Sequence, residues 1–359
     1  MTYEVARRLV SRGHSVEWFS ATFAGAAESE LIEGIRIIRS GRQWTVHWQA
    51  FRRYRHRLQE DFDVAIDQVN TMPFFTPLWT QIPKFMFIHQ LAREVWWYES
   101  PLPLSALGYL AETYYLRPYR RTPVLTISLS TQRDLRRIGF SGPITIVPLG
   151  IKAVSMNASQ QHDEPTFLYV GRLTPSKRVG DIIKAFRIFT DSVPKARLWL
   201  IGEGASAHIV TLKRLVAGLR LEKSIDFLGT VSDGEKFRRM ASAYALLMAS
   251  VREGWGLVVS EANSCGTPAI VYDVPGLRDS VIDGQTGLTV KADPQAMANQ
   301  MIRLWKNPAQ REQLSEGGKL FSQTLSFDKT AAIVEASLAT LITAGGAPGP
   351  RVTYSTGAN

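Results

Sequence analysis

The chain has 359 residues, of which 45% are hydrophobic and 21% charged, and its formal net charge at pH 7 is +10. At roughly 150 residues per domain this length predicts two domains, and the ordinary composition excludes collagen-like, coiled-coil and largely disordered proteins. A single cysteine, Cys265, excludes an internal disulfide framework and a cysteine-rich zinc site, and it indicates a reducing compartment such as the cytoplasm.

Short β-rich runs alternate with helical segments over residues 1–150, a pattern typical of parallel sheets with crossover helices. The predicted strands cover residues 15–20, 34–39, 63–69, 84–89, 124–128 and 144–148. The predicted helices cover residues 3–12, 44–57, 103–117 and 131–138. No run approaches the ~18 apolar residues of a membrane-spanning helix, and the charged N-terminus does not have the apolar core of a signal peptide.

The helix predicted over 44–57 carries the densest cluster of positive charge in the chain. Trp44, Trp48 and Phe51 are spaced to share one face of it. The arginines beside this face are Arg52, Arg53, Arg55 and Arg57. Two interpretations stay open: the aromatic stripe packs on the core, as most apolar stripes do, or the helix lies on an anionic membrane. The remaining positive charge is dispersed over both halves of the chain, which excludes a dedicated nucleic-acid partner.

The polar stretch over 152–165 lacks periodicity and predicts an interdomain linker. After it the predicted strands cover residues 166–170, 197–201, 225–228, 245–249, 268–272 and 287–290. The helices predicted near the end cover residues 294–306, 309–324 and 328–344. The predicted parts are therefore a first domain (1–151), the linker, a second domain (166–325), a helical segment (326–344) and a disordered tail (345–359). Two doubly wound α/β domains would leave a cleft between them, with ligands outside the carboxyl ends of the strands.

The first motif follows the strand predicted over 166–170. Gly171 ends that strand, and Arg172 and Lys177 lie in the loop that opens the next helix. Glycine permits close approach of a ligand to the backbone, a helix N-terminus carries partial positive charge, and the two cations suit a diphosphate. The alternative is a pair of solvated surface cations.

The second motif is Gly202-Glu203-Gly204, directly after the strand predicted over 197–201. It partly matches the glycine fingerprint of dinucleotide-binding folds, with Ala207 where a third glycine belongs. Because any tight turn from a strand to a helix favours glycine, this motif is weak by itself.

The third motif, SVREGWGLVVSEANSCGTP over 250–268, is the most specific. Glu253 lies in a glycine-rich loop at the mouth of a helix, and Glu261 lies further along that helix. Carboxylates accept paired hydrogen bonds from neighbouring hydroxyls, so two of them with backbone amides between can hold two sugar rings and the phosphates that link them. The alternative is one acid favoured by the helix dipole and one solvated glutamate.

Taken in order, these motifs resemble the retaining glycosyltransferases of family 4, the group 1 glycosyl transferases. The resemblance is strong over 167–290, where it also includes Phe227-Leu228-Gly229, Val274-Pro275-Gly276 and Asp283-Gly284-Gln285-Thr286-Gly287-Leu288. It is looser in the first half, at Arg12-Gly13-His14, Ile88-His89 and Pro148-Leu149-Gly150. It implies two facing Rossmann-like domains of the GT-B type, with the segment 326–344 returning to the first domain.

The resemblance also implies roles for individual residues. Arg172 and Lys177 would hold the donor diphosphate, and Glu261 would bind the ribose hydroxyls. Glu253, in contact with the donor sugar, and His89, near the reaction centre, are the catalytic candidates. The further residues implied in donor binding are Gly202, Val231, Gly254, Trp255, Gly256, Leu257 and Val258.

The reaction implied by the resemblance moves a sugar from a nucleotide sugar to a saccharide or lipid-linked acceptor, with retention of configuration and without a metal or other cofactor. Without the resemblance, His89 at a strand end is also compatible with a structural role. Trp96-Trp97-Tyr98 and the nearby Leu102 and Leu104 form either a contact loop for an acceptor or lipid, or part of the core.

The first helix raises a further expectation. Val5, Ala6, Leu9 and Val10 already form an apolar stripe, with no strand before them. In the family this helix follows a strand and a glycine-rich loop, so we expect the first domain to lack both, as in an N-terminally truncated fragment.

Other functions compete with glycosyl transfer. A catalytically silent nucleotide-sugar-binding protein and a nucleotide-sugar epimerase would use the same donor residues. A nicotinamide oxidoreductase would explain the Gly202-x-Gly204 turn but not Arg172, Lys177 and the two glutamates. The expected location is the cytoplasm, with contact to the inner face of an anionic membrane as an open possibility.

Overall fold

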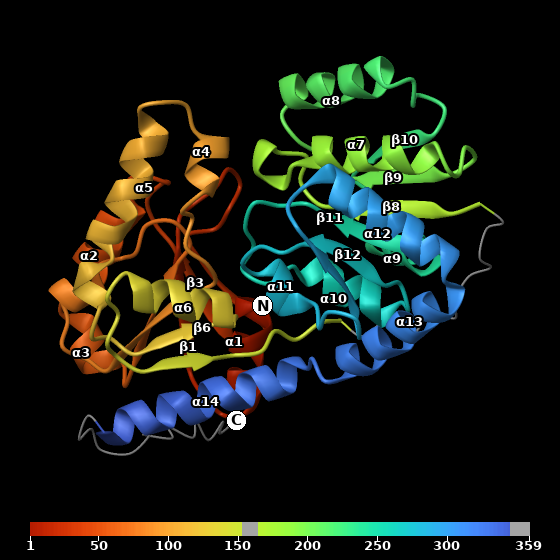
Figure 1. The fold of residues 1–359 in the computed structure, drawn as a ribbon. Helices are drawn as coiled ribbons and strands as arrows, with labels where there is room; N and C mark the ends of the chain where they lie inside the picture. Colours follow the sequence, from red (N-terminus) through yellow and green to blue (C-terminus); the bar gives the residue numbers. More distant parts are fainter. Residues whose placement is uncertain (153–163, 345–359) are drawn as a thin grey trace.

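The computed structural model describes residues 1–152 and 164–344, so most of the predicted linker and the whole tail predicted over 345–359 lie outside the described residues. The described chain is an α/β protein in which parallel-stranded sheets alternate with helices. Figure 1 shows two facing halves, the first drawn in red to yellow and the second in green to blue, with helix α14 (Phe327–Ala344) extending beneath the first half. The predicted class, α/β with two Rossmann-like halves, is confirmed.

The first half arranges its strands in two sheets. Its elements are α1 (Thr2–Ser11), β1 (Val16–Ser20), β2 (Ser29–Ile32), β3 (Ile35–Arg39), α2 (Val46–Tyr54), α3 (Arg57–Asp61), β4 (Ala65–Val69), η1 (Thr76–Leu78), β5 (Lys84–Ile88), α4 (Val95–Glu99), α5 (Leu104–Tyr115), η2 (Arg117–Tyr119), β6 (Val124–Thr126), α6 (Leu129–Arg137) and β7 (Ile144–Ile146). The smaller sheet has the order β1-β3-β2, with β1 parallel and β2 antiparallel to β3. The larger sheet, β4-β5-β6-β7, is parallel throughout.

All six strands predicted in the first half are confirmed, whereas β2 and α4 were not predicted. Both are short, and neither has a fully buried residue, so the hydrophobic pattern that predicts an element is missing from them. The helix predicted over 44–57 begins only at Val46, because the chain turns at Thr45, whose hydroxyl accepts a hydrogen bond from Arg42 N at 2.9 Å. The prediction that Trp44 shares a helix face with Trp48 is therefore wrong.

The second half is built on one six-stranded parallel sheet with the order β10-β9-β8-β11-β12-β13. Its elements are β8 (Thr166–Val170), η3 (Pro175–Lys177), α7 (Val179–Thr190), β9 (Arg197–Ile201), α8 (Ser206–Gly218), β10 (Ile225–Gly229), α9 (Asp233–Ser242), β11 (Ala245–Met248), α10 (Leu257–Ser264), β12 (Ala269–Tyr272), α11 (Leu277–Ser280), β13 (Gly287–Val290), α12 (Pro294–Lys306) and α13 (Pro308–Gln323). Every residue of the central strands β8 and β11 is buried. Such continuous apolar runs are typical of strands covered on both faces, and they explain why these strands were predicted to within a residue or two.

The C-terminal helix α14 packs on the first half of the chain. Val334 and Leu338 share a buried cluster with Val5 and Leu9 of α1. At the surface, Arg12 and Glu335 form an ion pair with a nitrogen–oxygen distance of 2.6 Å. Among the described residues, no helix is both long and apolar enough to span a membrane.

Candidate active site

The predicted donor-binding residues gather at the carboxyl-terminal edge of the six-stranded sheet. β8 and β11 lie side by side in its centre, although the chain forms β9 and β10 between them, so the strand order reverses at this point. Open parallel sheets bind ligands outside the carboxyl ends of their strands at such a reversal. Arg172 and Lys177 follow β8 and Glu253 follows β11, one group on each side of it.

Lys177 and Glu253 form an ion pair across the reversal point. Lys177 Nζ lies 2.5 Å from Glu253 Oε1, and both side chains are only about one-sixth exposed. Ser250 Oγ donates to the same carboxylate oxygen at 2.7 Å. The backbones of the two loops are also joined, because Val251 N donates to Ser176 O at 2.9 Å. A partly buried pair interacts more strongly than one in open solvent, so an anionic ligand here would compete with Glu253 for Lys177.

Arg172 is the second cation at this edge. Its carbonyl accepts a hydrogen bond from the buried Tyr169 hydroxyl at 2.7 Å, which fixes its backbone. Its side chain is exposed, and within the described ranges it makes no ion pair as short as that of Lys177 with Glu253. The carboxylate of Glu99, which accepts from Ser176 N, interacts electrostatically with Arg172, so two cations and two acids meet at this edge. Arg172 adds a bidentate donor for phosphate oxygens.

Gly202 brings the end of β9 against the loop that follows β8. A Cβ added at Gly202 would lie 1.9 Å from Gly171 O, and φ there is +133°. Gly204 is equally confined, since its Cβ would lie 1.9 Å from Leu173 O. These glycines are therefore required by contact between two parts of the protein's own backbone, and a nicotinamide cofactor is not needed to explain them.

Replacing Gly202 with alanine should lower the stability of the second half. The added Cβ clashes with a backbone carbonyl and the φ value is unfavourable for alanine, so we expect a loss of about 2–4 kcal/mol and a melting temperature lower by several degrees. The matched control is Gly218→Ala at the end of α8, where no atom lies within 4 Å of the added Cβ. Equal melting temperatures for the two variants would contradict this account of the turn.

The loop Glu253–Gly256 links the two halves of the protein. Glu253 N donates to Pro275 O at 2.9 Å, and a Cβ on Gly276 would lie 2.0 Å from Glu253 O. A Cβ on Gly254 would lie 3.0 Å from His89 O in the first half. Trp255 packs against the buried cluster of the first half, and its indole nitrogen donates to Ser260 Oγ at 3.0 Å. Gly256, with φ +88°, ends the loop at the start of α10.

Glu261 lies on α10 and is held by a lysine that sequence reasoning missed. Lys236 Nζ, from α9, lies 3.1 Å from both Glu261 carboxylate oxygens. Val258 of α10 and Val231, which follows β10, are half-buried against the core of the second half. Leu257 is exposed in the first turn of α10. Nothing in the spacing of α9 and α10 alone indicates that these helices are neighbours.

His89 follows β5 at the carboxyl edge of the larger sheet of the first half. Its ring stacks near Phe87 with a centroid distance of 4.8 Å, and its Nε2 lies 3.5 Å from Gln68 Nε2. Burial lowers the pKa of His89 to about 4, and the positive charge of the N-terminal amino group adds to the decrease. The imidazole is therefore neutral at physiological pH and suited to hydrogen bonding rather than to carrying charge.

The buried His89 predicts a measurable dependence of stability on pH. In the unfolded chain a histidine binds its proton near pH 6.5, whereas His89 in the folded protein does so only at about pH 4. The unfolded state therefore binds more protons in this window, and the contribution of His89 to stability falls as the pH falls through it. When the pH is lowered from 6.5 to 4, the melting temperature of the unmodified chain should fall, and we expect a smaller fall in His89→Asn. The exposed His56→Asn serves as the control, and an unchanged decrease in His89→Asn would refute the prediction.

Arg252 is the most important residue of this region that the sequence did not reveal. Only 7% exposed, it lies between two acids of the first half. Its Nε donates to Glu94 Oε2 at 2.8 Å and its Nη1 to Asp134 Oδ2 at 2.5 Å. Burial alone would lower the pKa of Arg252, but the hydrogen bonds to these acids raise it.

Two further hydrogen bonds join the halves. Ser176 N donates to Glu99 at 3.2 Å, and Ser130 N donates to Asp279 at 3.0 Å.

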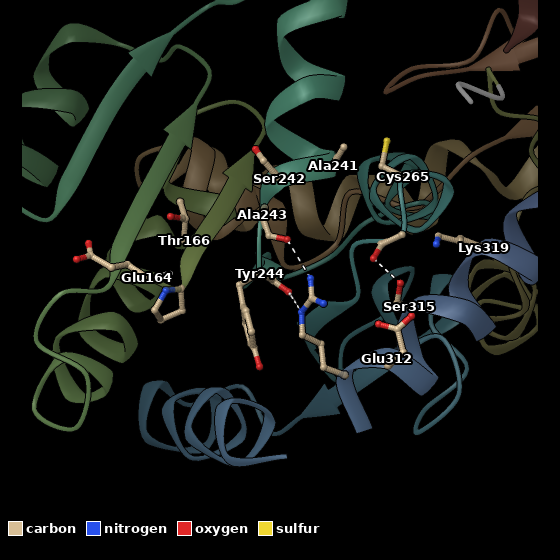
Figure 2. Close-up of a pocket in the computed structure, with 13 residues that line it drawn as sticks. Glu164, Thr166, Ala241, Ser242, Ala243, Tyr244, Cys265, Glu312, Ser315 and Lys319 are labelled. Atoms are coloured by element: carbon tan, nitrogen blue, oxygen red, sulfur yellow. Dashed lines mark hydrogen bonds between the residues drawn. The ribbon is translucent and has the colours of Figure 1, made fainter. Parts of the chain in front are cut away.

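A pocket of about 70 Å³ lies at the opposite, amino-terminal edge of the six-stranded sheet (Figure 2). Arg311 donates from Nε to Tyr244 O at 3.0 Å, and Ser315 donates to Gly266 O at 2.7 Å. These bonds attach α13 to the strand ends, so the pocket is a structural junction distinct from the candidate site. In residues 1–152 and 164–344 no cluster of histidine, cysteine or acidic side chains is arranged to hold a metal ion.

Two facing Rossmann-like halves, with cations and carboxylates where their strand ends meet, define the GT-B class of glycosyltransferase folds. Sucrose-phosphate synthase from Thermosynechococcus elongatus shares this fold with a TM-score of 0.79 at 22% identity, over 96% of this chain and 93% of that one. HepE from Anabaena, solved in complex with UDP and glucose, has a TM-score of 0.70 at 15% identity over 94% of each chain. At these identities the likeness establishes the fold alone.

The sequence models of two glycosyltransferase groups together match nearly all of the described chain. "Glycosyltransferase Family 4" matches residues 1–153 and "Glycosyl transferases group 1" matches residues 154–321. The chain therefore belongs to the family 4 (group 1) glycosyltransferases, as its motifs predict. D-inositol 3-phosphate glycosyltransferase of Pseudarthrobacter chlorophenolicus is 29% identical over 207 residues, which cover 56% of this chain and 49% of that protein. The chain thus spans about half the length of this curated relative.

Proposed function

We propose that the protein transfers a sugar from a nucleotide-sugar donor to a saccharide or lipid-linked acceptor, with retention of the anomeric configuration. One observation carries the proposal: Arg172 and Lys177 on one side of the strand reversal and Glu253 on the other bring two cations and a carboxylate to one point. Membership of family 4 supports it, as does the likeness in fold to HepE, whose structure was solved with UDP and glucose.

In the proposed reaction the donor diphosphate lies between Arg172 and Lys177 and displaces Glu253 from Lys177. Glu253 then accepts hydrogen bonds from the donor sugar, while Glu261 accepts them from the ribose. The two cations and the backbone N–H groups at the start of α10 stabilise the charge that develops on the leaving diphosphate. Retention follows when the acceptor attacks the face from which the diphosphate departs.

The first half supplies the acceptor side of the proposed site. His89, neutral and next to the backbone of Gly254, would form hydrogen bonds with hydroxyl groups near the reacting carbon. Independence of metal ions is part of the proposal, because Arg172, Lys177 and the helix N-terminus already supply positive charge to the diphosphate. A cytoplasmic location, which the single cysteine indicates, completes it.

Binding of nucleotide sugars is the first test of this proposal. A calorimetric screen with UDP-, GDP-, ADP- and TDP-sugars should identify a donor, and Glu261→Gln should weaken its binding by about 10- to 100-fold. This magnitude follows from the roughly 1.5–3 kcal/mol of a hydrogen bond to a charged group. Glu222→Gln, an exposed glutamate without an ion pair in the described chain, is the control. Equal donor affinity in the two variants would refute the assignment of Glu261.

Release of the nucleoside diphosphate separates this proposal from its competitors. A glycosyltransferase releases it in amounts that depend on the acceptor, whereas a silent binding protein releases none. An epimerase converts the donor sugar without an acceptor. Reduction of a nicotinamide cofactor by the protein would instead support an oxidoreductase.

A further inference from the structure

Helix α5 has the reverse of the usual amphipathic arrangement. Its fully buried residues are the polar Ser105 and Glu112. On the outer side, Leu104, Leu107 and Leu110 are between 57% and 64% exposed. Helices of water-soluble surfaces bury their leucines and expose their polar residues, so this helix presents a row of large apolar side chains that the described chain does not cover.

The orientation of α5 is fixed by its buried polar residue. The Glu112 carboxylate accepts hydrogen bonds from Ala92 N at 2.6 Å and from Arg93 N at 2.8 Å, which holds the loop that follows His89. On the neighbouring turn, a Cβ on Gly108 would lie 2.5 Å from the Trp96 ring, so α4 packs closely on α5. Rotating α5 to bury its leucines would break both contacts. The leucine row is therefore a consequence of how the site is built.

The leucine row is part of a larger exposed apolar surface, which we call the apolar face. Its members from α4, α5 and the segment between them are Trp97, Tyr98, Leu102, Leu104, Leu107, Leu110 and Tyr114. Tyr115 of α5 donates to Thr71 O at 2.7 Å, and His47 of α2 stacks near Phe74 with a centroid distance of 4.9 Å. The segment 71–78, with exposed Met72 and Leu78, therefore contacts both α5 and α2, and Trp48 of α2 is exposed as well.

Arginines lie at the end of α5 and on α2. Arg117 ends the leucine row, with its guanidinium carbon 4.2 Å from the centroid of the Tyr114 ring. Arg52 and Arg53 lie exposed on α2, and neither forms an ion pair with any described residue. The two acids at the ends of α4 are engaged elsewhere, the N-cap residue Glu94 with Arg252 and the last residue Glu99 with Ser176 N. Acidic side chains are exposed further along the chain, in α3, where Arg57 pairs with Asp61.

We infer that the apolar face and the arginines of α2 dock the protein on a bilayer that contains anionic phospholipid. Leucine and tryptophan side chains beside arginines match the apolar interior and the charged head groups of such a surface. A protein partner is less well matched, because unpaired arginines at its contact would need acids of their own.

Docking through the apolar face would also place the proposed acceptor site next to the bilayer. α4 carries part of this face, and its Glu99 accepts from Ser176 N in the loop of Lys177. The inference therefore specifies the acceptor as one anchored in the membrane by a lipid. This second step rests on the proposed function, whereas the docking itself does not.

Flotation with lipid vesicles tests the docking. The full chain should bind vesicles of phosphatidylcholine mixed with phosphatidylglycerol, and bind pure phosphatidylcholine vesicles weakly. Leu107→Gln combined with Leu110→Gln should weaken binding about 100-fold, because each leucine taken out of the apolar layer costs about a factor of ten. Leu320→Gln, an exposed leucine on α13 of the other half, should bind like the unmodified chain.

Arginine variants test the electrostatic part of the docking. Arg52→Gln and Arg53→Gln should each weaken binding to the anionic vesicles by about fivefold and reduce its sensitivity to salt. Arg214→Gln, an exposed arginine of α8, is the control and should have no effect.

The inference would be overturned if the chain did not bind anionic vesicles, or if the double leucine variant bound them as tightly as the unmodified chain does. A dimer in solution that the double leucine variant abolishes would also overturn it. Such a dimer would make a second copy of the chain the occupant of the apolar face. Nucleotide-sugar binding is measured on the same variants. Its loss in every variant would indicate failure of the proposed function or of folding, whereas its retention isolates the docking.

Discussion

Replacing Lys177 with alanine is expected to lower the rate of sugar transfer by about 10²- to 10³-fold. A cation fixed at the leaving group stabilises charge that appears mainly in the transition state, and removing one such group has effects of this size. The loss should appear in kcat as well as in KM, because Lys177 binds the diphosphate both before and after the bond to the sugar breaks. Steady-state kinetics with the donor identified by the calorimetric screen measures both constants.

The ion pair with Glu253 makes a control necessary. In Lys177→Ala, the Ser250 hydroxyl is the remaining side-chain partner of Glu253 among the described residues, so a displaced loop would add to the effect. Lys177→Arg keeps the charge and should recover part of the rate, and Lys184→Ala removes an exposed lysine of α7 with no effect. Identical rates in Lys177→Ala and the unmodified chain would remove Lys177 from the site.

The sequence predicts the second half of this protein better than the first, for a physical reason. β8, β11 and their neighbours are buried on both faces, so each appears as an uninterrupted apolar run that ends at a glycine. β2 is half exposed and is held only by β3, and α4 has no buried residue, so neither leaves a pattern in the sequence. Trp44 was placed on a helix by its spacing alone, but the turn at Thr45 separates it from α2.

The candidate site shows the same division between local and distant information. Glycines and charges next to strand ends, such as Gly202 and Lys177, could be found because the strand and its loop are continuous in the chain. Lys236 could not, because its contact with Glu261 depends on how α9 and α10 pack. Arg252 is separated from Asp134 by 118 residues and from Glu94 by 158, so only the folded chain brings them together.

In the proposed function, the second half binds the nucleotide and both halves are needed for transfer. The donor residues from Arg172 to Glu261 all belong to the second half, so the nucleotide could bind there without the first half. The proposed transfer also uses His89 beside Gly254, and we expect that arrangement to depend on the contacts of Arg252 with the first half. Changes at Arg252 should therefore separate binding from catalysis.

Arg252→Met is expected to lower the free energy of unfolding by about 3–5 kcal/mol and to reduce kcat while leaving the affinity for the nucleotide nearly unchanged. Removing one partner of a buried ion pair is strongly destabilising, and Asp134, the more buried of the two acids, keeps the exposed Arg137 as its ion-pair partner. Thermal unfolding measures the first effect, and kinetics together with calorimetry on the nucleotide measure the other two. Arg238→Met, which removes an exposed pair with Glu235, should change stability by at most about 1 kcal/mol.

A double-mutant cycle assigns the effect to the contact between the halves. If Arg252 acts through Asp134, then Arg252→Met combined with Asp134→Asn should lose less than the sum of the two single changes, with a coupling of about 1–3 kcal/mol. The coupling with Glu94→Gln should be smaller, because Glu94 is half exposed and its interaction is screened by water. Full additivity with both acids, or a loss of nucleotide affinity as large as the loss of kcat, would show that Arg252 serves the donor loop itself and does not hold the two halves in register.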